Sequence, residues 1–144
     1  MKRFLLPILL ALAAVPYLQA RPVALFYMTN SPDSIRSFLG HSKQIDLLVP
    51  TWYQVDENGL VTGAPEPTVL KQAHDEALPV MPILALFNKK GFHELATNPG
   101  AQIEMNAAMI RECKLHGYTG FQFDFENIDW TDRDLLTALV KSSA

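Results

Sequence analysis

Two carboxylates lie close together late in the chain, in the stretch 120–127, which reads Gly-Phe-Gln-Phe-Asp-Phe-Glu-Asn. Because side chains alternate across a β-strand, a strand here carries Gln122, Asp124 and Glu126 on one face and phenylalanines on the other. Two carboxylates on one strand face repel each other, and a fold that accepts them often keeps one protonated. The spacing therefore favours a general acid beside a second carboxylate. The alternative is an amphipathic strand whose polar face meets water.

The first 20 residues have the pattern of a secretory signal peptide. Two basic residues precede the apolar run 4–15, and Ala20 offers a small residue for cleavage. The run is shorter than the roughly 20 apolar residues that cross a bilayer. Leu18 is large for its place before the cut, so an uncleaved anchor stays open as an alternative. We expect residues 21–144 to be exported to the periplasm or the extracellular space, without stable membrane association.

Composition and charge indicate one domain with a substantial core. Of the 144 residues 49% are hydrophobic, and the formal net charge is −3. The chain has no cluster of Lys and Arg, which argues against a nucleic acid or an anionic membrane surface as partner. Cys113 is the only cysteine, so no internal disulfide forms, and its apolar neighbours favour a core residue over a nucleophile. We expect neither a metal nor another cofactor, because metal-ligand spacing is missing among His41, His74, His93 and His116.

Apolar runs and helical patterns alternate along the chain. The expected strands cover residues 23–28, 45–55, 79–87 and 120–126. The expected helices cover residues 34–39, 68–77 and 101–116, and a fourth begins after Thr131 or Asp132 as its cap. Within this pattern Thr68 is the expected cap of the second helix, and Gly40 and Gly117 are expected to end the first and the third.

Other local signals concern the strands and loops. The first run is apolar enough to be buried on both sides of a sheet. The turn residues 56–59 predict a small hairpin that returns through residues 60–62. Pro82 is awkward inside a central strand and suggests a bulge or a strand that starts late. Residues 88–100 read as a polar loop.

Strands that alternate with helices indicate right-handed βαβ units and a parallel sheet. The neighbours of the strand at 120–126 are apolar, so its polar face is hard to explain as a solvated edge. Polar groups that converge at the C-terminal ends of parallel strands mark a site. This context favours the functional interpretation of Asp124 and Glu126.

The stretch from Gly120 to Glu126 resembles the signature of glycoside hydrolase family 18, the chitinase-type family, which reads Asp-Gly-x-Asp-x-Asp-x-Glu. Gly120, Asp124 and Glu126 match this signature, whereas Thr119 and Gln122 stand where it has Asp. The continuation Asp-Phe-Glu-Asn-Ile is similar to the bacterial branch of spore-cortex and cell-wall lytic enzymes, which often carry an amide at the position of Gln122. Weaker similarity extends to Trp52-Tyr53, Asn58-Gly59 and Gly117-Tyr118.

The resemblance implies a fold and a mechanism. The fold is α/β, a (β/α)8 barrel of the TIM type, with about the first four β/α units present in this chain. The reaction is retaining, with the acetamido oxygen of the substrate as nucleophile. Glu126 is then the general acid and later the base, and Asp124 orients the acetamido group and stabilises the oxazolinium ion. Gln122, Tyr53 and Trp52 are the expected substrate-binding residues, with ordinary core packing as the alternative for the two aromatic rings.

A complete barrel takes about 250 residues, so we expect residues 21–144 to be the N-terminal half of a catalytic barrel and inactive alone. A half-barrel that dimerises is the alternative. The expected substrate is a polysaccharide or oligosaccharide of β-1,4-linked N-acetylglucosamine, either chitin or peptidoglycan. A glycan-binding, lectin-like protein and an unrelated α/β protein with Asp124 and Glu126 in a salt-bridge network remain as alternatives. The presence of Glu126 favours the enzyme.

Overall fold

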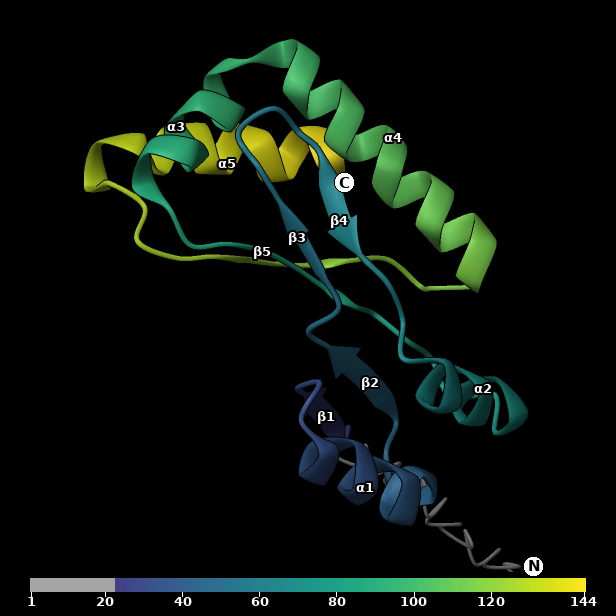
Figure 1. The fold of residues 1–144 in the computed structure, drawn as a ribbon. Helices are drawn as coiled ribbons and strands as arrows, with labels where there is room; N and C mark the ends of the chain where they lie inside the picture. Colours follow the sequence, from purple (N-terminus) through teal and green to yellow (C-terminus); the bar gives the residue numbers. More distant parts are fainter. Residues whose placement is uncertain (1–22) are drawn as a thin grey trace, which may run out of the picture.

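The computed structural model describes residues 23–144. The predicted signal peptide, its cleavage site and the alternative anchor lie outside this range. Among the described residues no helix has the length and hydropathy that a membrane span requires. The chain forms an α/β fold in which helices pack against short strands, as Figure 1 shows.

The strands form two connected sheets. A parallel pair is followed by a mixed sheet of order β4-β3-β5-β6, in which only the pairing of β3 with β4 is antiparallel. A parallel bridge between Leu48 and Val80 joins the two sheets. The strands are β1 (Leu25–Met28), β2 (Leu47–Pro50), β3 (Tyr53–Val55), β4 (Val61–Gly63), β5 (Ile83–Leu86) and β6 (Gln122–Phe125). The alternation of strand and helix predicted from the sequence is therefore confirmed, and the sheet is mixed because the β3–β4 hairpin adds an antiparallel strand.

The second predicted strand, residues 45–55, is divided into β2 and β3. The break lies at Thr51 and Trp52, where the Trp52 N–H donates to the carbonyl oxygen of Pro50 at 3.0 Å. The predicted hairpin is confirmed, with Tyr53 opposite Gly63 in the register. At Pro82 the late start is confirmed, because β5 begins at the next residue.

Two glycines fix the hairpin in place. Gly59 has φ +81°, and a Cβ atom built on it would lie 2.0 Å from the carbonyl oxygen of Ala101. A Cβ atom on Gly63 would lie 2.0 Å from the carbonyl oxygen of Trp52. The tip of the hairpin therefore presses against the start of α4 (Pro99–His116), and its base presses against the break between β2 and β3.

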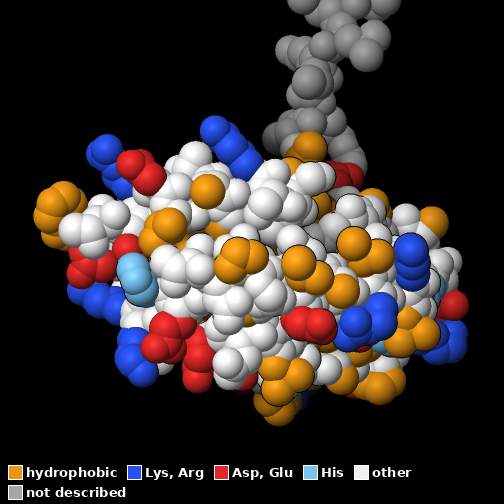
Figure 2. All heavy atoms as spheres, turned by 90° about the horizontal axis from the view of Figure 1, so that it is seen from above, with side chains coloured by type: hydrophobic (Ala, Val, Ile, Leu, Met, Phe, Trp, Pro, Cys, Tyr) orange, Lys and Arg blue, Asp and Glu red, His pale blue; other side chains and the backbone are white. Residues whose placement is uncertain are grey.

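The helices cluster in two groups. Figure 1 shows α3, α4 and α5 together at one end of the strands, and α1 and α2 at the other. Their bounds are α1 (Pro32–His41), α2 (Pro67–Asp75), α3 (Lys89–Thr97), α4 (Pro99–His116) and α5 (Arg133–Ser143), with short 3-10 turns η1 (Ser42–Gln44) and η2 (Trp130–Asp132). On the face of the molecule seen in Figure 2, hydrophobic side chains are interspersed with charged ones.

Two of the three predicted helix boundaries differ from the structure. Gly40 does not end α1, because the helix runs on through it to His41. Glu66, not Thr68, caps α2, since its carboxylate accepts from the N–H of Val69 at 2.6 Å and Pro67 begins the helix. By contrast, Gly117 ends α4 as predicted, in the left-handed conformation with φ +69°.

The predicted polar loop at 88–100 is wrong, because most of it is α3. Asn88 caps this helix by accepting from the N–H groups of Lys90 and Gly91. Phe92 and Leu95 bury its apolar side. With only two large apolar residues in a short polar segment, the helical period was too weak to recognise.

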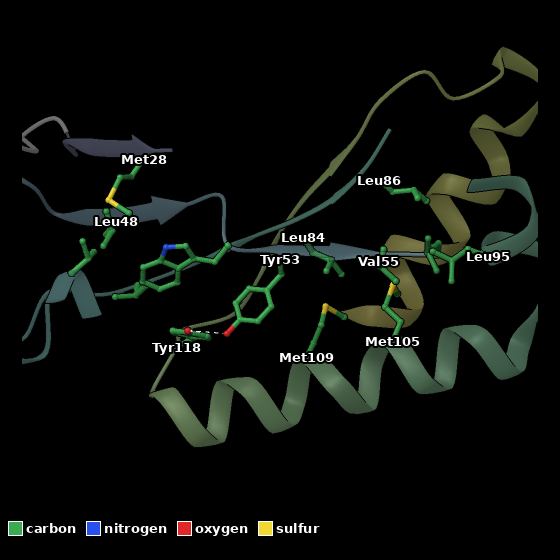
Figure 3. Packing of buried hydrophobic residues seen from close by; sticks show 14 of the residues in the cluster. Met28, Leu48, Tyr53, Val55, Leu84, Leu86, Leu95, Met105, Met109 and Tyr118 are labelled. Atoms are coloured by element: carbon green, nitrogen blue, oxygen red, sulfur yellow. Dashed lines mark hydrogen bonds between the residues drawn. The ribbon is translucent and has the colours of Figure 1, made fainter. Parts of the chain in front are cut away.

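The two faces of the sheets differ in how well they are covered. On the helix side, residues such as Leu84, Leu95 and Met105 form one core with the helices (Figure 3). On the opposite face, Val49, Ile83 and Ala85 form a smaller cluster. The prediction that β1 is buried on both sides is wrong, because Leu25 and Tyr27 on this second face are both 53% exposed. This open face carries the polar residues of β6.

Candidate active site

Strand β6 presents its polar residues on the open face. In the register with β5, Gln122 lies opposite Ile83 and Asp124 lies opposite Ala85. Phe123 and Phe125 point to the other side, and their rings are stacked with centroids 5.0 Å apart. The alternation expected from the sequence thus separates the carboxylate from the phenylalanine core.

Glu126 follows β6 and, two residues after Asp124, continues the polar face of this strand. Its N–H donates to the carbonyl oxygen of Leu86 at 2.9 Å, which continues the pairing of β6 with β5 beyond the strand. The Glu126 side chain is exposed, and that of Asp124 is partly buried. Within residues 23–144 neither carboxylate forms an ion pair or a side-chain hydrogen bond. The alternative in which they belong to a salt-bridge network therefore gains no support.

Asp124 lines a cavity of about 420 Å³ on the open face. This volume lies in the range of small-molecule sites, roughly 300–1,000 Å³. The cavity is bordered by the ends of β1, β2 and β5 and by the β3–β4 hairpin. Side chains that can donate or accept hydrogen bonds stand around it beside aromatic rings: Asn30, Thr51, Gln54, Thr62, Tyr27 and Phe87. Gln122 lies on the same face but is not among the lining residues.

The structure places the rings of Trp52 and Tyr53 in the core. Both residues border the cavity, yet they are only 4% and 2% exposed. The hydroxyl of Tyr53 reaches Glu112 and Tyr118 on the helix side, and Figure 3 shows its ring pointing toward α4. The ring of Trp52 packs against that of Tyr118, with centroids 6.1 Å apart. Core packing, the alternative left open by the sequence, describes both rings.

Two aromatic residues that the sequence analysis passed over are exposed in the cavity instead. Tyr27 is 53% exposed and Phe87 is 50% exposed. Tyr27 pairs with Val49 in the register of β1 with β2, so the period of two along β1 is the signal that identifies it. Phe87 is the first residue after β5, at the end of the strand where sites in parallel sheets form.

On the helix side of the sheet, Tyr53, Tyr118 and Cys113 surround Glu112, and the pKa values of these three residues are raised. Burial raises the pKa of Tyr118 to about 12, and burial with the hydrogen bonds to Tyr118 and Glu112 raises the pKa of Tyr53 as well. Burial and the nearby charge of Glu112 raise the pKa of the Cys113 thiol. A raised pKa keeps Cys113 in the thiol form, which is the less nucleophilic one.

The part of the chain that the structure describes contains no group of three or more His, Cys, Asp or Glu residues placed to hold a metal ion. The cavity itself offers the carboxylate of Asp124, the amides of Asn30 and Gln54 and the exposed rings of Tyr27 and Phe87.

Comparison with known proteins rests on structure alone. No protein-family model and no curated protein sequence matches the chain. A chitinase from Chromobacterium violaceum superposes with a TM-score of 0.74 at 17% identity, covering 84% of this chain and 40% of the chitinase chain. The chain has an α/β fold like that of part of such chitinases. The TIM-barrel type of α/β fold that the resemblance implies is thereby supported by structure.

Two further matches agree. A class V chitinase from Pseudomonas fluorescens Pf-5 gives a TM-score of 0.75 at 18% identity, over 85% of this chain and 40% of the other. The spore cortex-lytic enzyme SleL of Bacillus cereus gives 0.76 at 12% identity, over 84% of this chain and 31% of the other. The chain thus spans less than half of the length of each of these structures.

Proposed function

We propose that this chain is part of a glycoside hydrolase of the family 18 type, acting on β-1,4-linked N-acetylglucosamine polymers, either chitin or peptidoglycan. The observation that carries the proposal is the position of Asp124 and Glu126. Asp124 lines the cavity, and Glu126 follows two residues later at the C-terminal end of the same parallel strand, in a fold shared with chitinases and SleL. Active sites of TIM-type barrels lie at this end of the strands.

In the proposed mechanism Glu126 protonates the leaving glycosidic oxygen and then activates water as a base. Asp124 orients the acetamido group, whose oxygen attacks the anomeric carbon, and stabilises the positive charge of the oxazolinium ion. Both side chains are free of protein partners within residues 23–144, so their oxygens remain available to a substrate. The amide of Gln122 offers hydrogen bonds on the same strand face but carries no charge.

Aromatic and polar residues of the cavity would contact the sugar. The exposed rings of Tyr27 and Phe87 offer apolar surface to the faces of pyranose rings. Asn30, Thr51 and Gln54 offer hydrogen bonds to hydroxyl groups. These residues take over the role that the sequence assigned to Trp52 and Tyr53.

We further propose that residues 21–144 correspond to the N-terminal part of a barrel and that residues 1–20 direct its secretion. Support comes from the open face of the sheet, where Leu25, outside the cavity, exposes apolar surface that further β/α units would cover. The intact mass of the native secreted protein tests this. A mass well above that of residues 21–144 supports a larger barrel, and a mass equal to it argues for a half-barrel.

The proposed activity is tested by Glu126→Gln in the native protein, with chitin oligosaccharides and peptidoglycan as substrates. We expect hydrolysis to fall about 100-fold or more while glycan binding is unchanged, because the amide keeps the shape but cannot transfer the proton. Glu104→Gln on the exposed side of α4 is the matched control and should leave the rate unchanged.

A glycan-binding, lectin-like protein is the second candidate, and the amide of Gln122 is the observation that favours it, since the amide can only hydrogen-bond. Binding without hydrolysis in both the native protein and Glu126→Gln would establish this candidate and reject the hydrolase.

A further inference from the structure

The segment that follows Glu126 is fastened to the segment that follows β5. The side-chain amide of Asn127 donates to the carbonyl oxygen of Phe87 at 3.4 Å. Two residues on, Asp129 lies 3.9 Å from the ammonium group of Lys89. Asp129 also accepts from the N–H and the hydroxyl of Thr131, which closes a tight turn. Figure 1 shows this segment passing beside α3 before α5 begins.

The last and most buried of these attachments is the pair of His93 and Asp132. Nδ1 of His93, on α3, lies 3.0 Å from both carboxylate oxygens of Asp132. Asp132 is 6% exposed and is the one buried charged side chain among residues 23–144. A buried carboxylate is costly unless it is paired, so the His93 ring, itself 57% exposed, stabilises the Asp132 carboxylate where it is buried.

Asp132 is the N-cap residue of α5. An aspartate at this position usually accepts hydrogen bonds from the backbone N–H groups of the first helical turn. Here its side chain makes no such bond. The carboxylate is directed toward α3 instead of its own helix.

We propose that His93 and Asp132 form a positioning pair that holds the segment 126–132 against α3 and thereby keeps Glu126 at the end of β6. This inference rests on the proposed function, because Glu126 is the acid only if the chain is a glycosidase. The segment is anchored at its first residue by the hydrogen bond of the Glu126 N–H to Leu86 and at its last by the contact of Asp132 with His93, and the weaker contacts of Asn127 and Asp129 lie between them. Losing the second anchor lets the segment move and loosens the first.

Amide hydrogen exchange in the native protein tests the pair, with the N–H groups of Glu126, Thr131 and Asp132 as reporters, because all three are hydrogen-bonded. We expect His93→Ala to raise exchange at these amides roughly tenfold and to leave β5 and α4 unchanged. Adding Asp132→Asn should restore part of the protection, since no unpaired charge is then buried. Asp134→Asn is the matched control, because that carboxylate is exposed two residues further along.

Three results would overturn the proposal: exchange at Glu126 that does not change, exchange that rises uniformly over the whole protein, or a double variant that exchanges as fast as His93→Ala. A second readout separates positioning from stability. If the native protein hydrolyses chitin oligosaccharides, His93→Ala should lower kcat and leave KM unchanged, and a rise in KM alone would contradict positioning. If no hydrolysis occurs in any form, the proposed function fails, while the exchange data still decide whether the pair anchors the segment.

Discussion

The hydroxyl of Tyr53 donates a hydrogen bond to Oε2 of Glu112 across 2.9 Å, which ties β3 to the C-terminal half of α4. The same hydroxyl lies 3.1 Å from that of Tyr118, so three side chains from separate elements share one buried polar contact. Tyr53 is therefore a structural residue behind the sheet, while the cavity proposed to bind the sugar opens on the other face.

Replacing Tyr53 by Phe should lower the free energy of unfolding by about 1–2 kcal/mol, because Glu112 and Tyr118 lose a buried partner. Glycan affinity should not change. Urea unfolding and calorimetric titration with a chitin oligosaccharide measure the two quantities, and Tyr27→Phe is the control for removing a half-exposed hydroxyl. A loss of affinity at unchanged stability would show that Tyr53 contacts the sugar after all.

Alkaline pH should destabilise the protein through the same cluster. Burial raises the pKa of Tyr118 from its ordinary value of 10.0 to about 12, so the folded state holds its proton where the unfolded state has lost it. The stabilisation is complete well below pH 10 and is lost as the pH rises toward 12, by roughly 2.7 kcal/mol at most. Unfolding free energies at pH 9, 10 and 11 give the slope of stability against pH. The slope should be smaller in Tyr118→Phe, and equal slopes would exclude Tyr118 as the cause.

Tyr27→Ala and Phe87→Ala should each weaken glycan binding about five- to tenfold, because each removes a ring face from the cavity. Their cost in stability should be small, since both side chains are half exposed. Titration calorimetry measures the affinity, and Leu60→Ala removes an exposed apolar side chain that does not line the cavity. If the Leu60 variant weakens binding as much as the others, the cavity is not the sugar site.

Gln122→Asp should change both the rate of hydrolysis and its pH dependence. A carboxylate at this position would stand on the same strand face as Asp124 and disfavour a second negative charge there. The acidic limb of the pH–rate profile should therefore move to higher pH. Asn58→Asp adds the same charge in the exposed hairpin turn and should leave the profile in place. An unchanged rate and profile in Gln122→Asp would mean that residue 122 takes no part in the reaction.

The sequence is informative where one period covers a whole element. The alternation of Phe123 and Asp124 predicted both the strand and the face that carries the carboxylates, because successive side chains of a strand point to opposite faces. Gly117 likewise predicted the end of α4, and the observed start of this helix lies two residues before the predicted one.

The remaining differences come from contacts between distant residues. Nothing local to Trp52 and Tyr53 shows which side of the sheet their rings occupy, because the chain breaks its alternation between β2 and β3. The partner of Asp132 lies 39 residues earlier, on a helix that the sequence pattern did not reveal. The cavity is formed by the ends of several strands, so its aromatic lining became visible only with the register of β1 and β2.

The two glycines that dock the β3–β4 hairpin have a consequence for how a ligand enters. Thr62 and Gly63 of this hairpin line the cavity, and the hairpin is wedged at its tip against Ala101 and at its base against Trp52. Backbone packed this closely leaves no room for a hinge. This side of the cavity is a rigid wall whose shape is set before a ligand arrives, so selection on this side depends on fit to a fixed surface and not on the closing of a flap.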